Sequence, residues 1–146
     1  MHTVNTMLIW GTANPTGECD ETYHGVYLQH KDIDAFVHEI CNKPVKVEHA
    51  GDPVGKVVHA WKNAQSGLDC IMEVDETNLN GAIISSLVDH QCAKELSLGY
   101  RVRLNMSGTE KPATNSKVCL EKEVMEVSIV KRGMRPNCKI HGFCRT

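Results

Sequence analysis

The chain has 146 residues, of which 41% are hydrophobic and 23% are charged. This length and composition predict one globular domain spanning residues 1–146. The formal net charge is −2, which argues against a protein that binds nucleic acid through phosphate contacts. The most apolar stretch, residues 81–88, is far shorter than the roughly 20 residues that a membrane helix needs, so we expect no membrane partner.

The seven cysteines are odd in number and scattered along the chain. A secreted disulfide framework usually has an even, patterned set, and the first residues lack the basic flank and apolar run of a secretion signal. We therefore expect reduced thiols in a reducing compartment, the nucleus or the cytoplasm.

Two helices and one long loop are predicted from local patterns. Residues 11–21 are rich in turn-forming residues and predict an exposed loop. A first helix is predicted over residues 32–41, where four apolar residues recur at helical spacing: Ile33, Phe36, Val37 and Ile40. A second is predicted over residues 78–96, with Thr77 or Asn78 as its cap and an apolar stripe of Leu79, Ile83, Leu87 and Val88.

The remaining periodic segments are short and rich in β-branched or aromatic residues, which is typical of strands. They are Val4–Trp10, Tyr23–Gln29, Val45–His49, Val54–Trp61, Leu68–Val74, Leu96–Asn105, Lys117–Glu121 and Val124–Lys131. Many short strands with two inserted helices predict a mainly β fold with α, namely a mostly antiparallel, closed or nearly closed barrel surrounded by a few helices.

Two of these strands carry polar residues on one face. In residues 96–104 the alternation places Ser97 on the polar face beside Gly99, which would leave room for a substrate at a nucleophile. In residues 124–130 it places Glu126 opposite the apolar face, although carboxylates are depleted in strands. The simpler interpretation of both patterns is a solvated sheet face.

His49 ends a predicted strand, just before a turn, where a histidine could reach into a cleft. His59 is the rival candidate for a general base. It lies within an apolar stretch, however, which is more typical of a core histidine.

Three segments together resemble the capsid maturation proteases of herpesviruses (assemblins) and the prohead proteases of tailed phages. PVKVEHAGDPVGKV, residues 44–57, is similar to the segment that carries the family's base; ELSLGY, residues 95–100, is similar to the nucleophile strand; and EVSIVKRGMRP, residues 126–136, is similar to the third motif. Glu126 stands where assemblins have a histidine and where the phage enzymes have a glutamate.

The resemblance implies a serine endopeptidase that cleaves a capsid scaffold protein during procapsid maturation. It implies Ser97 as nucleophile, His49 as base and Glu126 as the third triad member. The oxyanion and substrate would lie near Gly133, Met134 and Arg135, together with Gly99 from the strand pattern. It also implies a viral procapsid as the location, the scaffold protein as partner, a homodimer as a candidate assembly, and no cofactor.

Two other interpretations remain open. Cys138, His141 and Cys144 are compact in sequence, and His90 and Cys92 could add ligands, as in a small structural zinc domain. The paired Cys-x-x-Cys or His-x₃₋₅-His spacing of most zinc sites does not occur, so no metal is predicted. The other alternative is a non-catalytic barrel that binds a partner.

Overall fold

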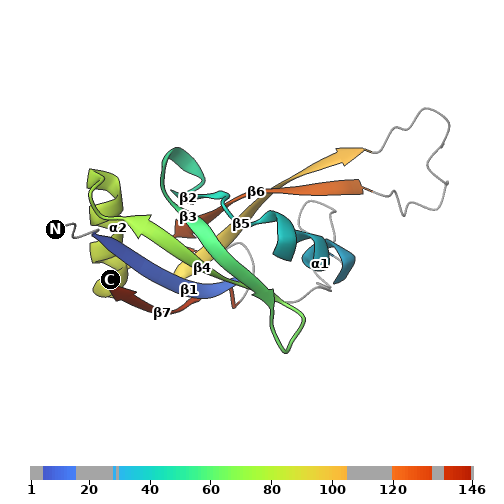
Figure 1. Cartoon of the computed structure of the whole chain (residues 1–146), viewed down its shortest axis with the longest axis horizontal. Coiled ribbons are helices and arrows are strands. Elements are labelled where there is room, and N and C mark those ends of the chain that lie inside the picture. Colours follow the sequence, from blue (N-terminus) through green and yellow to red (C-terminus); the bar gives the residue numbers. More distant parts are fainter. Residues whose placement is uncertain (1–4, 16–27, 29, 105–119, 133–136, 146) are drawn as a thin grey trace.

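The computed structural model describes residues 5–15, 28, 30–104, 120–132 and 137–145 (Figure 1). Within these residues the chain forms strands and two helices in the following order: β1 (Thr6–Asn14), α1 (His30–Glu39), β2 (Pro44–Val47), β3 (Ala50–Lys62), β4 (Leu68–Asp75), α2 (Leu79–Asp89), β5 (Glu95–Leu104), β6 (Leu120–Val130) and β7 (Ile140–Arg145). The mainly β class with helices is confirmed.

All seven strands belong to one sheet, in the order β5-β6-β2-β3-β4-β1-β7. Neighbouring strands are antiparallel except β2 and β6, which run parallel. The sheet curls through 195° into an open half-barrel, so the prediction of a closed or nearly closed barrel was wrong. The edge strands β5 and β7 meet only at a bridge between Glu95 and Lys139, because the chain before Glu95 turns away toward α2.

The core fills the concave side of the curled sheet. Its largest fully buried side chains are Phe36, Met7, Ile9, Leu28, Ile33, Ile40, Leu68, Met72, Leu96, Ile129, Val45 and Val57. Helix α1 contributes the apolar residues that its sequence pattern predicted, and the ring of Phe36 contacts that of Tyr100 on β5. A largely buried ion pair between Asp32 and Lys122, 2.7 Å long, fastens α1 to β6.

Helix α2 begins where predicted but presents a different face to the sheet. Asn78 caps it, its side-chain oxygen accepting hydrogen bonds from the main-chain N–H groups of the first turn. The buried residues are Gly81, Ile84, Ser85 and Val88. The predicted apolar stripe is largely exposed: Leu79, Ile83 and Leu87 are 75%, 50% and 40% exposed. Small residues explain the difference, because a Cβ at Gly81 would lie 1.9 Å from the carbonyl oxygen of Asp75.

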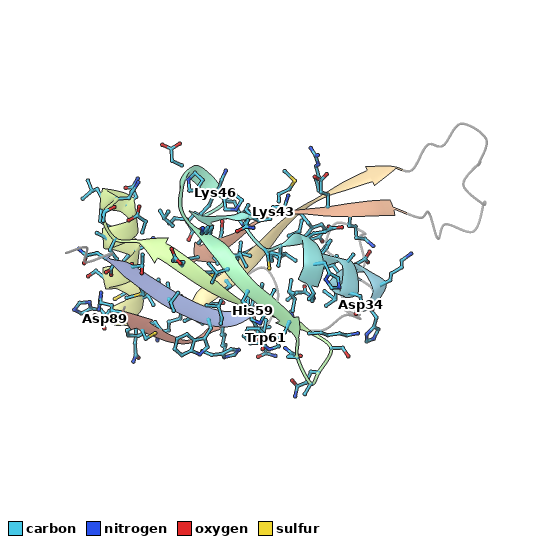
Figure 2. All side chains as sticks on the ribbon, viewed as in Figure 1. Asp34, Lys43, Lys46, His59, Trp61 and Asp89 are labelled. Carbon is cyan, nitrogen blue, oxygen red and sulfur yellow. The ribbon has the colours of Figure 1, made fainter. Side chains whose placement is uncertain are left out.

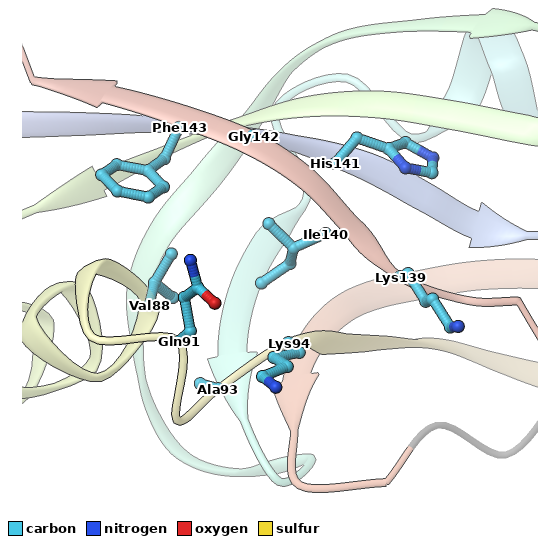
Figure 3. Close-up of a pocket in the computed structure, with 9 residues that line it drawn as sticks. All are labelled: Val88, Gln91, Ala93, Lys94, Lys139, Ile140, His141, Gly142 and Phe143. Atoms are coloured by element: carbon cyan, nitrogen blue, oxygen red, sulfur yellow. The ribbon is translucent and has the colours of Figure 1, made fainter.

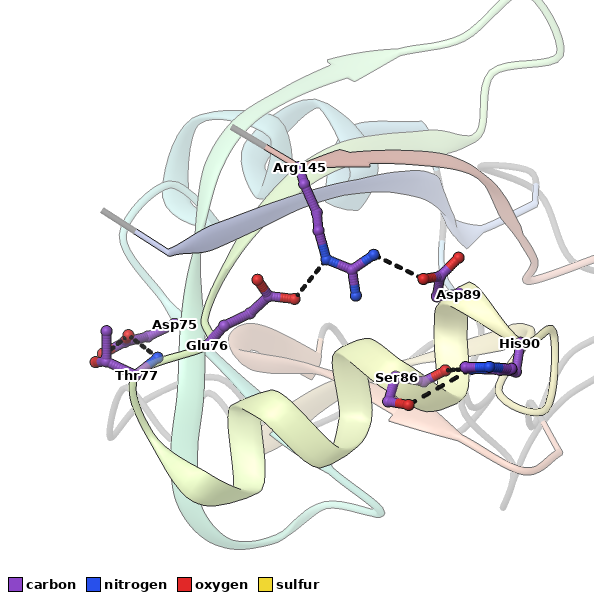
Figure 4. A network of polar contacts seen from close by, with 7 residues as sticks. All are labelled: Asp75, Glu76, Thr77, Ser86, Asp89, His90 and Arg145. Carbon is purple, nitrogen blue, oxygen red and sulfur yellow. Dashed lines mark hydrogen bonds and ion pairs between the residues drawn. The ribbon is translucent and has the colours of Figure 1, made fainter. Parts of the chain in front are cut away.

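Strand β7 is attached to α2 by a surface ion-pair network (Figure 4). Arg145 donates to Glu76, which lies just before α2, at 3.0 Å. It also donates to Asp89, the last residue of α2, at 2.6 Å. This strand was not predicted, because it forms by pairing with β1 at the other end of the sequence.

Three other predicted boundaries change. Residues 120–121, the described part of the strand predicted over 117–121, and residues 124–130 belong to the single strand β6, and residues 11–14 continue β1 instead of opening an exposed loop. The rest of that loop, and the strand predicted over 23–29 apart from Leu28, lie outside the described residues.

Helix α2 also ends at Asp89, well before the predicted end at residue 96. In the described ranges, no helix has both the length and the apolar character needed to cross a membrane. None of the five cysteines in these ranges forms a disulfide: Cys41, Cys70, Cys92, Cys138 and Cys144.

Candidate active site

The sheet topology brings three distant parts of the sequence together. Strands β5, β6 and β2 are consecutive in the sheet, and they carry Ser97, Glu126 and the residues just before His49. In the register, Ser97 lies opposite Ser128, and Gly99 lies opposite Glu126. The parallel pairing of β2 with β6 places the end of β2 beside residues 127–129. The fold therefore gathers side chains that are 77 and 48 residues apart in the chain.

His49 lies on a two-residue hairpin turn between β2 and β3. Val47 pairs with Ala50, and the residues between them, Glu48 and His49, have φ angles of 53° and 58°. Positive φ at both central residues is the requirement of a type I′ turn, for which Asn-Gly is the usual sequence. Histidine is among the residues enriched at positive φ, whereas glutamate is not.

Three hydrogen bonds attach this turn to β6. Glu48 donates its main-chain N–H to the carbonyl oxygen of Ile129 at 3.1 Å, and its side chain accepts from the N–H of Lys131 at 2.6 Å. The N–H of His49 donates to the hydroxyl of Ser128 at 2.9 Å. The turn is therefore held against the strand that carries Glu126.

The predicted triad residues form one continuous hydrogen-bonded chain. Ser97 Oγ lies 2.8 Å from His49 Nε2, and His49 Nδ1 is hydrogen-bonded to Glu126 Oε1. Ser97 and Glu126 are buried, at 3% and 8% exposure, whereas the His49 side chain is 38% exposed. Ser97 therefore does not lie on a solvated sheet face, and the imidazole lies between a buried hydroxyl and a buried carboxylate while still meeting solvent.

Ser128 is a buried member of the site that the sequence analysis did not single out. Its hydroxyl donates to Glu126 Oε2 at 2.7 Å and accepts from His49 N. One hydroxyl thus fixes both the carboxylate and the backbone of the histidine. The sequence indicates Ser128 only by its position two residues after Glu126, which places both side chains on the same face of the strand.

Gly99 has a role that the strand pattern did not predict. A Cβ at this position would lie 2.1 Å from Glu126 Oε1. The glycine therefore makes room for the carboxylate beside the imidazole. The other residues expected near the oxyanion, Gly133, Met134 and Arg135, lie outside the described residues.

The rival base is not part of this site. His59 is exposed on β3 and stacks against Trp61, with ring centroids 5.6 Å apart (Figure 2). It is therefore not the core histidine that its apolar neighbours suggested.

The residues of the alternative zinc site separate in the fold. Cys138 is buried and donates to the carbonyl oxygen of Ala13, the His141 Nε2 lies 2.7 Å from Thr12 Oγ1, and Cys144 is exposed. His90 is hydrogen-bonded to the main chain of its own helix. Among the residues that the structure describes, no group of three or more His, Cys, Asp or Glu side chains could hold a metal ion.

Comparisons of the sequence with protein-family models and with curated proteins found no match. Solved structures resemble it strongly in fold. The protease of Kaposi's sarcoma-associated herpesvirus (KSHV), solved with a hexapeptide phosphonate inhibitor, has a TM-score of 0.63 and 16% identity over 97% of this chain. This chain covers 66% of that protease chain, slightly less than two thirds.

Two further structures of the same viral protease give similar values. The complex with an allosteric inhibitor, compound 250, has a TM-score of 0.58 and 16% identity over 96% of this chain and 78% of that one. The complex with a dimer disruptor has a TM-score of 0.53 and 15% identity over 96% and 77%. The protein therefore has a fold similar to that of a herpesvirus protease.

Proposed function

We propose that the protein is a serine endopeptidase whose catalytic residues are Ser97, His49 and Glu126. The observation that carries the proposal is the hydrogen-bonded chain from hydroxyl through imidazole to carboxylate. Both contacts are within the reach that nucleophile–base and base–acid pairs need. The likeness in fold to a viral protease supports the same reaction class.

In the proposed mechanism, Ser97 Oγ attacks the carbonyl carbon of the substrate peptide. His49 Nε2 accepts the hydroxyl proton and then passes it to the leaving amine. Glu126 accepts the hydrogen bond of the Nδ1–H, which fixes the tautomer and stabilises the imidazolium that forms. Water, activated by the same imidazole, then releases the acyl group from Ser97. No cofactor is required for these steps.

The developing oxyanion also needs hydrogen-bond donors. By the resemblance of residues 126–136 to the family's third motif, we assign this role to the main chain of Gly133 and Met134, with Arg135 beside it. A hydrogen bond between Glu48 and Lys131 fixes the backbone shortly before this segment.

The substrate class follows from the same resemblance. We infer that the enzyme cuts a capsid scaffold protein after a small residue such as alanine, inside an assembling viral procapsid in the host nucleus or cytoplasm. A homodimer is the corresponding assembly. One KSHV protease structure contains a dimer disruptor, which supports examining that state here.

The reaction class is tested with a fluorophosphonate probe, because it requires no knowledge of the substrate. We expect covalent labelling of Ser97, lost in Ser97→Ala and in His49→Ala. The matched control is Ser86→Ala, which removes an exposed serine on α2. Labelling that continues at full strength in Ser97→Ala, or that maps to another serine, would refute the assignment.

The substrate class needs a separate measurement. The protein is incubated with a peptide library, and the products are identified by mass spectrometry. We expect cleavage after small residues, absent in Ser97→Ala. Labelling of Ser97 without any peptide cleavage would instead indicate a hydrolase of another class.

A further inference from the structure

A groove lies between the C-terminal end of α2 and β7, and Ser97, His49 and Glu126 are not among the residues that line it (Figure 3). Its volume is about 260 Å³, and apolar side chains of Val88, Ile140 and Phe143 line it. We propose that this groove binds an extended segment of a partner polypeptide with an apolar and an acidic side chain two residues apart, which adds as a strand to β7. This proposal goes beyond the protease activity and does not depend on it.

The first support is the unpaired outer edge of β7. This strand ends the sheet order, and β1 occupies its inner edge. On the outer edge, the N–H of Ile140 donates to the carbonyl oxygen of Lys94 at 2.8 Å. Beyond this bond the opposing chain, residues 91–93, turns toward α2, and no strand of the described residues pairs with β7 there. Such an edge can accept the main chain of an extended peptide.

The second support is the charge of the groove. Lys94 and Lys139 lie at one end of it (Figure 3), and none of the residues that line it is acidic. Neither ammonium group has a carboxylate partner among the residues described. Side chains two residues apart in a strand point to the same side. A carboxylate two residues from an apolar side chain would therefore meet the lysines while that apolar side chain enters the groove.

The test uses ¹⁵N-labelled Ser97→Ala protein, so that no peptide is cut, and a capped peptide in which valine and glutamate lie two residues apart, with threonine between them. We expect shifts of the amide resonances of residues 140–143 and a dissociation constant that rises at least tenfold in the double variant Lys94→Glu/Lys139→Glu. Lys94→Gln/Lys139→Gln is the second variant should charge reversal prevent folding. Lys31→Glu, on the exposed face of α1, is the control and should leave binding unchanged.

Several outcomes would overturn the proposal. These are no binding at millimolar peptide, equal binding of a valine–lysine peptide, unchanged binding in both double variants, and shifts that map to β5. Identical shifts with N-acetylglutamate alone would show a small-anion site instead. Tighter binding of a single-stranded oligonucleotide would show a nucleic-acid site, and a dimer dissolved by the double variant would show that the occupant is a second copy.

Discussion

Glu126 is a carboxylate in an otherwise apolar strand, and its two oxygens are both used, one by His49 and one by Ser128. Replacing it with glutamine keeps the shape but removes the charge and disturbs the tautomer of the imidazole. We expect Glu126→Gln to lower the rate of fluorophosphonate labelling by about 10²–10⁴-fold, as in other triads. The matched control is Glu123→Gln on the same strand, an exposed residue paired with Arg101. Equal rates in both variants would make Glu126 structural.

Ser128 is expected to act on the reaction through the residues that it holds. Removing its hydroxyl leaves Glu126 and His49 free to shift, and small misplacements of catalytic groups cost about 100-fold in rate. We expect Ser128→Ala to lower labelling by about 10- to 100-fold and to shift its pH profile, with partial rescue in Ser128→Thr. Ser85→Ala is the control, because that serine is also fully buried but its hydroxyl has no hydrogen-bond partner in the described structure. An unchanged pH profile in Ser128→Ala would indicate a merely structural role.

The described cysteines differ in burial, which predicts different reactivities. Burial, with smaller contributions from Asp69 and Cys41, raises the pKa of the Cys70 thiol to about 12. A thiol reacts as its thiolate, which forms only as the pH approaches the pKa. At pH 8 we therefore expect iodoacetamide to modify the exposed Cys92 and Cys144 within minutes and to leave Cys70 unmodified, as read by peptide mass spectrometry. Rapid modification of Cys70 in the folded protein would show that β4 opens readily.

At the scale of elements, α2 shows how small residues choose which side of a helix is buried. Adjacent isoleucines lie on opposite sides: Ile84 is 4% exposed and Ile83 is 50% exposed. We expect Ile84→Ala to lower the free energy of unfolding by about 2–4 kcal/mol, because it leaves a cavity. Ile83→Ala should change it by less than about 1 kcal/mol. Urea denaturation of both variants measures this, and a larger effect of Ile83→Ala would mean that the exposed stripe is covered in solution.

Local patterns in the sequence predicted some helices and strands and missed others. The period of α1 and the alternation of β5 and β6 are local patterns, so they were visible in the sequence and place Ile33, Ser97 and Glu126 correctly. The face that α2 buries depends on the approach of Gly81 to Asp75, a contact that periodicity does not show. Strand β7 pairs with β1, which lies near the other end of the sequence, so no local pattern indicates it.

The residues of the candidate site were likewise predictable only in part. The meeting of Ser97, His49 and Glu126 was expected from motifs that resemble a family, since alternation alone favoured a solvated sheet face. The bridging role of Ser128 and the space left by Gly99 depend on strand register. Register between β5 and β6 is a non-local property that no single segment encodes.

At the scale of the molecule, the half-barrel has a stable middle and two free edges. Strand β4 is paired on both sides, by β1 and β3, whereas β7 is paired on one. We expect amide hydrogen exchange at Cys70 and Met72 to require global unfolding, and exchange at Gly142 and Cys144 to be at least about tenfold faster. Mass spectrometry or NMR of the exchanging protein measures both. Equal protection of the two strands would mean that the edge of β7 is covered in solution.

The parallel pairing of β2 with β6 also sets when the proposed catalytic residues can come together during synthesis. His49 is made 77 residues before Glu126, which at 5–20 residues per second is an interval of about 4–15 s. Until β6 has been made, the turn that bears His49 has neither Ser128 nor Ile129 to hold it, and β5 lacks its neighbour. A growing chain therefore has the proposed nucleophile and base with nothing to align them until β6 has been made.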